Sequence, residues 1–202
     1  MSGMMQPVSA PGPTAILVRH GETEWSRARR HTGRTDIELT ARGEEQAKGI
    51  RPLLEQGPPD TVLCSPLRRA RRTAELAGLT PYELDDDLRE WDYGDFEGRT
   101  TPDIAESLPG WTIWDGPWSG GETVEQVGER ADRVLRRVLG EPAGARVAVV
   151  AHAHLLRVLA ARWVDEPARF GRLLGLDTAT VSELGWEHGR RVVRRWNVAV
   201  DA

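Results

Sequence analysis

Short runs of consecutive apolar residues mark three strands along the chain. They cover residues 15–18, 61–64 and 147–151. Runs of this length that contain several β-branched residues are typical of strands buried on both faces of a sheet. We therefore expect these three segments to be strands of a largely parallel sheet.

Other segments carry apolar residues at intervals of three and four, which predicts amphipathic helices. Thr40 can cap the first of them, and the turn at residues 57–60 stops it. The predicted helices cover residues 40–54, 67–76, 122–139 and 155–163.

Strands that alternate with helices indicate an α/β fold, a three-layer α/β/α sandwich with a mainly parallel central sheet. Two apolar stretches near the carboxyl end, residues 181–186 and 191–196, flank a turn and predict a closing hairpin. We expect a single domain over residues 14–202. Residues 1–13, rich in Pro, Gly and Ser, predict a flexible amino-terminal tail.

Each of the three predicted strands is followed by charged or hydrogen-bonding residues. Arg19 and His20 follow the first, Ser65 with Arg68 and Arg69 follows the second, and His152 follows the third. The carboxyl ends of parallel strands meet at one edge of a sheet, where ligands bind. Two histidines, several arginines and a helix amino terminus suit a phosphoryl group.

Composition narrows the functional class. A formal net charge of -4 argues against a general nucleic-acid binder, and no run is apolar enough to span a membrane. The single cysteine, Cys64, cannot form an internal disulfide, and residues 1–14 lack the pattern of a secretory signal. We therefore expect a cytoplasmic protein whose partner is a small phosphorylated metabolite, with no nucleic acid and no membrane.

Several short motifs, in order, are similar to those of the histidine phosphatase superfamily, the phosphoglycerate-mutase-like group. The resemblance starts at residues 19–25 and continues through 32–36, 39–40, 65–70 with 73–74, 88–94 with 97–98, 120–123 and 151–152. Each motif alone is only weakly specific for the family. The ordered set covers nearly the whole folded chain and is highly specific.

The resemblance implies a role for each catalytic residue. His20 would be the nucleophile that becomes phosphohistidine. Arg19 and Arg69 would bind the phosphoryl oxygens, and His152 would support them. Glu90 would donate a proton to the leaving oxygen. No metal and no cofactor is implied.

The resemblance also implies a substrate side of the site. Thr32 and Gly33 would line it, and Gly21 would let a ligand approach the backbone closely. Ser26 stands where mutases carry an asparagine that touches phosphate, and Ala153 stands where many members have glycine.

Each of these residues has a structural alternative. His20 or His152 could cap a strand end, Glu90 could be a surface carboxylate, and Arg68 or Arg72 rivals Arg69 in the same run. Trp111, Trp114 and Trp118 are spaced as on a helix and are expected to pack in the core or under a flap rather than read substrate.

Two further alternatives concern metal and oligomeric state. If residues 152–154 continued a strand, His152 and His154 would point the same way and could share a metal, although no third ligand lies nearby in sequence. The apolar helix at 155–164 is either core or the interface of a homodimer.

The function expected from the sequence is a metal-independent phosphomonoesterase for sugar phosphates or phosphoglycerate-like esters. Mutases of the family have a longer insert with further basic residues, whereas residues 101–121 are short and contain no Lys or Arg. The run at 85–94 with residues 111–114 looks most like the branch of sedoheptulose-bisphosphatase-like and acid phosphatases. The alternatives are a cofactor-dependent phosphoglycerate mutase and an inactive sensor of phosphorylated ligands.

Overall fold

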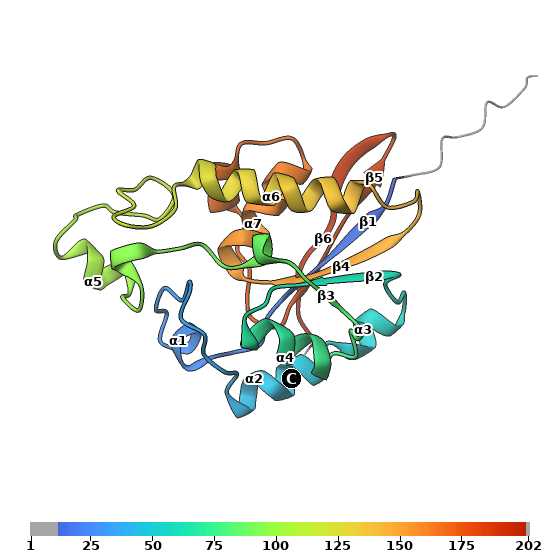
Figure 1. Cartoon of the computed structure of the whole chain (residues 1–202), viewed down its shortest axis with the longest axis horizontal. Coiled ribbons are helices and arrows are strands. Elements are labelled where there is room, and N and C mark those ends of the chain that lie inside the picture. Colours follow the sequence, from blue (N-terminus) through green and yellow to red (C-terminus); the bar gives the residue numbers. More distant parts are fainter. Residues whose placement is uncertain (1–11, 201–202) are drawn as a thin grey trace, which may run out of the picture.

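A six-stranded β-sheet forms the centre of the molecule in the computed structural model, which describes residues 12–200 (Figure 1). In sheet order the strands are β3 (Glu83–Leu84), β2 (Thr61–Cys64), β4 (Arg146–Ala151), β1 (Thr14–Arg19), β5 (Val181–Glu187) and β6 (Arg190–Val198). Strands β1 to β4 run parallel, while β5 pairs antiparallel with β1 and β6 antiparallel with β5. The expected α/β fold is confirmed, and the predicted hairpin is the antiparallel edge of a mixed sheet.

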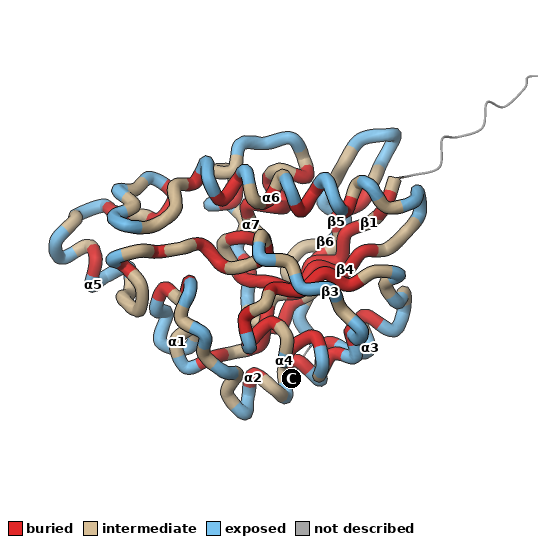
Figure 2. The backbone as a smooth tube through the Cα atoms, in the orientation of Figure 1, coloured by how far each residue is buried: buried red, intermediate tan, exposed pale blue. Residues whose placement is uncertain are grey.

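Alternation of side chains along the strands gives the sheet two apolar faces, each covered by helices. Ala15 and Leu17 belong to the core cluster under α6 and α7, whereas Ile16 and Val18 belong to the cluster under α2, α3 and α4. Figures 1 and 2 show this layering, with the strands buried and the outer sides of the helices exposed. These helices are α2 (Ala41–Gly49), α3 (Arg51–Glu55), α4 (Arg68–Leu76), α6 (Val124–Leu139) and α7 (Ala153–Trp163).

The helix expected over residues 40–54 is two helices, so that prediction was wrong in its interior. It begins as expected, because Thr40 accepts a hydrogen bond from the Gly43 backbone N–H at 2.9 Å. It breaks at Ile50, two residues before Pro52. Proline has no N–H to donate, and its ring clashes with the carbonyl four residues earlier, so a straight helix cannot continue through it.

Residues 85–123, between β3 and α6, form an irregular segment, and up to residue 121 the sequence pattern predicts no helix or strand in it. It contains η1 (Asp86–Leu88), η2 (Gly94–Phe96) and α5 (Thr101–Ala105), and it packs near α1 (Glu24–Arg27) through a bridge between Arg30 and Thr100. Trp111 and Trp114 are buried in the core as expected, but the segment that carries them is not helical.

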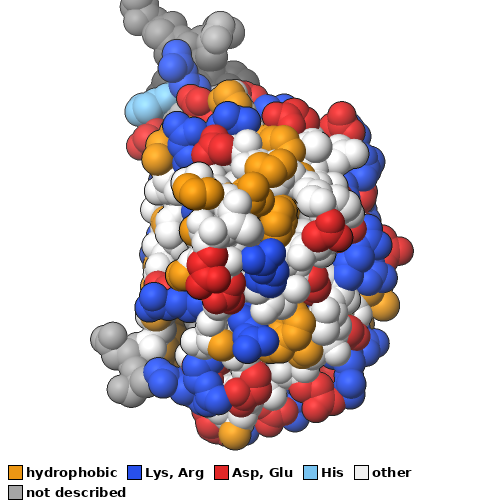
Figure 3. All heavy atoms as spheres, turned by 90° about the vertical axis from the view of Figure 1, so that its left-hand side faces the viewer, with side chains coloured by type: hydrophobic (Ala, Val, Ile, Leu, Met, Phe, Trp, Pro, Cys, Tyr) orange, Lys and Arg blue, Asp and Glu red, His pale blue; other side chains and the backbone are white. Residues whose placement is uncertain are grey.

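The ends of the chain and the surface bear on the remaining expectations. Most of the predicted tail, residues 1–11, lies outside the described part, so the division at residue 13 stays a prediction. Within residues 12–200 no helix combines the length and apolarity that crossing a membrane requires. Figure 3 views the side on which α1 and α5 lie, where acidic, basic and apolar side chains are interspersed.

Candidate active site

A cavity of about 340 Å³ opens at the carboxyl edge of the parallel strands. It lies beyond the ends of β1 and β4, at the first turn of α7, and the irregular segment closes its other side. Its lining residues are Arg19, His20, Ser26, Arg29, Arg30, His31, Thr32, Glu90, Tyr93, Ala153, His154, Arg157, Leu176 and Asp177.

His20 leaves the end of β1 and is nearly fully buried in the cavity wall. Its Nδ1 lies 2.7 Å from the Gly21 carbonyl oxygen. A carbonyl can only accept, so Nδ1 carries the ring proton and Nε2 keeps its lone pair. Burial and the charges of Arg69 and Arg19 hold the pKa of His20 well below its ordinary value. The ring therefore stays neutral, with an unprotonated Nε2.

Arg69, in the first turn of α4, is fully buried beside the cavity. Its guanidinium donates to the carbonyls of Thr32 (3.0 Å), Gly33 (3.0 Å) and Thr35 (2.9 Å), and its Nε donates to His152 Nδ1 at 3.1 Å. These bonds fix the planar guanidinium group of Arg69, with its fork of N–H donors, in one orientation. Burial lowers the pKa of Arg69, yet an arginine keeps its charge at any physiological pH.

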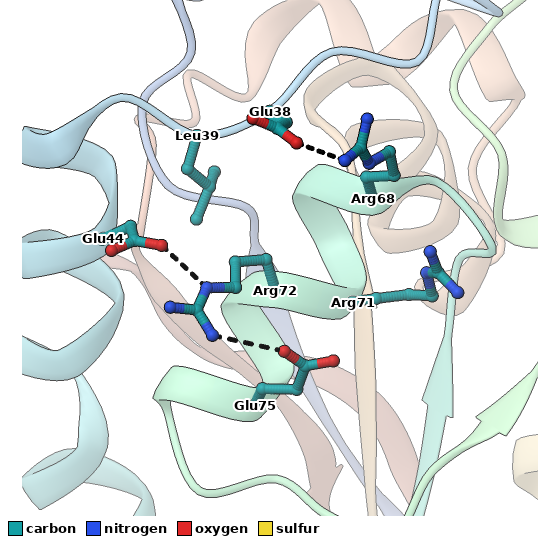
Figure 4. A pocket seen from close by; sticks show the side chains of 7 residues that line it. All are labelled: Glu38, Leu39, Glu44, Arg68, Arg71, Arg72 and Glu75. Atoms are coloured by element: carbon teal, nitrogen blue, oxygen red, sulfur yellow. Dashed lines mark hydrogen bonds and ion pairs between the residues drawn. The ribbon is translucent and has the colours of Figure 1, made fainter.

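The neighbouring arginines of α4 turn away from the site. Figure 4 shows Arg68, Arg71 and Arg72 around a separate depression that also contains Glu38, Glu44 and Glu75. Arg68 pairs with Glu38, and Arg72 pairs with Glu44 at 2.7 Å. The same helix thus carries a buried arginine at the site, Arg69, and two exposed arginines outside it, Arg68 and Arg72.

His152 directly follows β4 and is the N-cap residue of α7. It is fully buried, with its ring centroid 5.1 Å from that of His20. Because Arg69 donates to Nδ1, the proton resides on Nε2, which donates to Ser65 Oγ at 2.8 Å. Burial and the charge of Arg69 hold the pKa of His152 well below its ordinary value. Residues that follow β2 and β4 thus form one hydrogen-bonded group of Ser65, Arg69 and His152, and His20, which follows β1, lies next to it. The sequence predicts this convergence of the three strand ends.

Arg19 reaches the cavity from the last position of β1. One terminal nitrogen donates to the Leu176 carbonyl, while its Nε is buried without a partner among the described residues. Burying an unpaired charged donor is unfavourable unless an acceptor is supplied. The group is therefore suited to an incoming anion.

Glu90 also lines the cavity and caps α7 from outside the helix. Its Oε1 accepts from the backbone N–H groups of Trp91 (2.9 Å) and Leu155 (3.0 Å), and its Oε2 accepts from that of His154 (3.0 Å). The first N–H groups of a helix lack partners within the helix, which explains why a carboxylate is held there. Oε2 has fewer protein partners and is the oxygen more available to the cavity.

Arg130, on α6, holds the backbone that carries Glu90. It donates to the carbonyls of Asp87 (2.6 Å) and Arg89 (2.9 Å) and pairs with Glu122 at 2.7 Å. Sequence reasoning missed this residue, because a helical arginine gives no sign of the distant carbonyls that it meets.

The residues expected on the substrate side divide into two groups. Ser26, Thr32 and Ala153 line the cavity. Gly21 and Gly33 do not: a Cβ on Gly21 would lie 2.3 Å from the Gly43 carbonyl oxygen, and one on Gly33 would lie 2.4 Å from the Trp91 carbonyl oxygen. These two glycines permit close packing of backbone on backbone, and their expected contact with a ligand stays a prediction.

The strand alternation assumed for His152 and His154 does not occur, because α7 begins at Ala153. His154 instead turns its Nδ1 to the Tyr93 hydroxyl at 2.6 Å. Among residues 12–200 no three His, Cys, Asp or Glu side chains are grouped so as to hold a metal ion.

Eight cavity residues were absent from the predicted site: Arg29, Arg30, His31, Tyr93, His154, Arg157, Leu176 and Asp177. Some of these carried a usable signal in the sequence: Tyr93 lies within a family-like motif, His31 directly precedes one, and His154 follows His152 by two positions. Arg157 could have been found by its place one turn after His154 on α7.

Comparisons with known proteins agree with this geometry. The family model of the histidine phosphatase superfamily (branch 1) matches residues 15–199. An acid phosphatase of Mycobacterium tuberculosis is 44% identical over 178 residues, 87% of this chain and 88% of that protein. Sedoheptulose 1,7-bisphosphatase of Saccharomyces cerevisiae is 36% identical over 189 residues, 75% of this chain and 67% of that protein.

Among solved structures, the product of open reading frame Rv3214 from Mycobacterium tuberculosis superposes with a TM-score of 0.90 at 42% identity, covering 93% of this chain and 98% of that one. The sequence motifs, the fold and the site geometry therefore all indicate the same family. The chain belongs to the histidine phosphatase superfamily (branch 1), and it is a phosphatase.

Proposed function

We propose that the protein is a metal-independent phosphomonoesterase that hydrolyses small phosphate esters, sugar phosphates or phosphoglycerate-like compounds, through a phosphohistidine on His20. One observation carries the proposal: the Nδ1 proton of His20 is engaged by the Gly21 carbonyl, which leaves an unprotonated Nε2 beside two arginines. A neutral imidazole nitrogen is a competent nucleophile toward phosphorus.

In this proposal Arg19 and Arg69 bind the phosphoryl oxygens. The unpartnered Nε of Arg19 supplies one donor, and the carbonyl bonds of Arg69 preorganise its fork. His152 is a positioning residue in the described geometry, since both ring nitrogens are bonded to Arg69 and Ser65. Donors fixed before the reaction stabilise the charge on the equatorial oxygens without reorganisation.

Glu90 is the proposed proton donor to the leaving oxygen. It lines the same cavity as His20, and the start of α7 holds it in place. An alkoxide is a poor leaving group and needs a proton as the P–O bond breaks. The resulting carboxylate can then take a proton from the water that attacks phosphohistidine.

Ser26, Thr32 and Ala153 are proposed to contact the ester group of the substrate, and Gly21 and Gly33 to shape the backbone around it. The similarity to an acid phosphatase and to a sedoheptulose bisphosphatase supports a phosphorylated metabolite as the substrate. The buried free thiol of Cys64 is compatible with the reducing cytoplasm.

Phosphate release in EDTA from 4-nitrophenyl phosphate, sugar mono- and bisphosphates, phosphoglycerates and nucleotides tests the proposal. We expect release by the wild type and none above background by His20→Asn. Release that requires an added metal ion, or that survives the substitution, would contradict it. Isomerisation of 3-phosphoglycerate without phosphate release would identify a mutase instead.

A further inference from the structure

Tyr93 and His154 form a hydrogen-bonded pair on the wall of the cavity next to Glu90. The Tyr93 hydroxyl lies 2.6 Å from His154 Nδ1, and the His154 backbone N–H donates to Glu90 Oε2 at 3.0 Å. Both side chains line the cavity. The pair therefore lies where the leaving group of a substrate would extend from the proposed acid.

Aromatic contacts hold both rings in place. The Tyr93 ring centroid is 4.7 Å from that of His31, and the His154 ring meets Trp91 edge-on at 6.1 Å and Trp114 at 5.4 Å. Edge-on and tilted arrangements of this kind are favourable and restrict ring rotation. The polar atoms of the pair are thus positioned before any ligand arrives.

Both members of the pair are neutral. Burial and the charge of Arg157 hold the pKa of His154 well below its ordinary value, while burial and the nearby Glu90 hold the pKa of Tyr93 well above its own. Neutral imidazole carries one N–H and neutral phenol one O–H, so the pair has two protons and uses one in its internal hydrogen bond.

The second proton is left for a ligand in either tautomer. If the Tyr93 hydroxyl donates to Nδ1, then His154 Nε2–H is a donor and the phenolic oxygen an acceptor. If Nδ1–H donates to the phenolic oxygen, the hydroxyl is the donor and Nε2 the acceptor. No described residue bonds His154 Nε2. Each arrangement offers one donor and one acceptor, which is the complement of an alcohol group.

We propose that Tyr93 and His154 form a specificity subsite that binds a hydroxyl of the leaving group, so that polyhydroxylated phosphate esters are preferred over esters without hydroxyls. This inference rests on the proposed phosphatase function. A site built to hydrogen-bond a substrate hydroxyl discriminates against the analogue that lacks it, because the buried polar groups are then left unpaired.

The test compares glycerol 3-phosphate with n-propyl phosphate, which has the same carbon chain without the hydroxyls. The quantity measured is the ratio of their kcat/KM values. We expect Tyr93→Phe and His154→Phe each to lower this ratio about tenfold, the effect of losing one hydrogen bond of ~1.4 kcal/mol. The double variant should lose little more than either single variant, because the two residues act as a unit.

Matched controls are Tyr82→Phe and His188→Asn, which change a half-buried tyrosine and an exposed histidine that do not line the cavity. Both should keep the wild-type ratio. If His154→Phe does not fold, His154→Asn also removes Nε2 and should lower the ratio.

A merely structural role would lower kcat/KM for both esters together and leave the ratio unchanged in folded variants, which would overturn the inference. Failure of the proposed function gives a different result, because His20→Asn would then still release phosphate from both esters.

Discussion

The two ends of the cavity are built in different ways. At the end proposed to bind the phosphoryl group, here called the phosphoryl end, Arg19 is the last residue of β1 and His20 follows it. His152 follows β4, and Arg69 lies in the first turn of α4 after β2. At the end proposed to hold the leaving group, here called the leaving-group end, Glu90 and Tyr93 come from the irregular segment between β3 and α6. The sheet fixes the first end, whereas side-chain hydrogen bonds and aromatic contacts fix the second.

This difference matches the proposed task of each end. The phosphoryl group is the same in every ester, so a rigid group of buried donors on strand ends serves all substrates. The leaving group varies among substrates, and a wall made from an irregular segment can change without disturbing the sheet. We expect substitutions at the first end to affect all esters and those at the second to depend on the leaving group.

The largest expected effect is at His20. His20→Asn removes the proposed nucleophile and should lower kcat/KM by at least about 10³-fold for every ester. His188→Asn is the matched control, because His188 has a positive φ of 47°, which asparagine tolerates. A loss confined to some esters would break the distinction between the two ends.

Arg69→Lys should lower kcat by about 10²–10³-fold for all esters. A lysine cannot reproduce the fork that meets three carbonyls and His152. Arg72→Lys, in the same helix, should stay near the wild-type rate because Arg72 pairs with exposed carboxylates away from the site. Steady-state kinetics on 4-nitrophenyl phosphate would show whether the two variants differ.

Glu90→Gln tests the leaving-group end. It should lower the rate with n-propyl phosphate by about 10²-fold or more, since an alkoxide needs the proton. The loss with 4-nitrophenyl phosphate should be much smaller in the phosphorylation step, because nitrophenolate leaves unaided. Equal losses with both esters would count against Glu90 as the acid.

The smallest expected effect concerns stability and His31 at the leaving-group end. Burial lowers the pKa of His31 from 6.5 to about 4. Between these pH values the unfolded chain binds more protons than the folded one, so stability falls as the pH drops through this range. The titration of His31 alone should lower the free energy of unfolding by about 2 kcal/mol at pH 5.

Urea unfolding at pH 7.5 and pH 5 measures this effect. His31→Asn should lose less stability than the wild type between the two pH values, whatever its stability at pH 7.5. An unchanged difference between the two pH values would show that His31 does not titrate as its burial implies.

The sequence predicted the phosphoryl end well for a physical reason. Apolar runs identify buried strands, and parallel strands bring their carboxyl ends to one edge, so residues 19–20, 65–69 and 152 had to lie close together. The choice of Arg69 over Arg68 and Arg72 came from the resemblance to a family, and the structure shows Arg69 buried at the site.

The leaving-group end could be predicted only in part. Glu90 came from the resemblance, but its cap on α7 joins residues 64 and 65 positions apart in the chain. Tyr93 and His154 are 61 positions apart in the chain. A strand continued over residues 152–154 would have pointed His154 the same way as His152 and not toward Tyr93. Irregular backbone has no periodicity, so contacts of this kind do not follow from local sequence.

Covalent labelling of His20 tests the central claim most directly. Glu90→Gln should form phosphohistidine from 4-nitrophenyl phosphate at a useful rate and hydrolyse it slowly, so the intermediate should accumulate. After an alkaline quench, mass spectrometry should find base-stable, acid-labile phosphate on His20, formed and lost at rates that account for turnover. Continued turnover with no protein-bound phosphate, or with phosphate on another residue, would contradict the account.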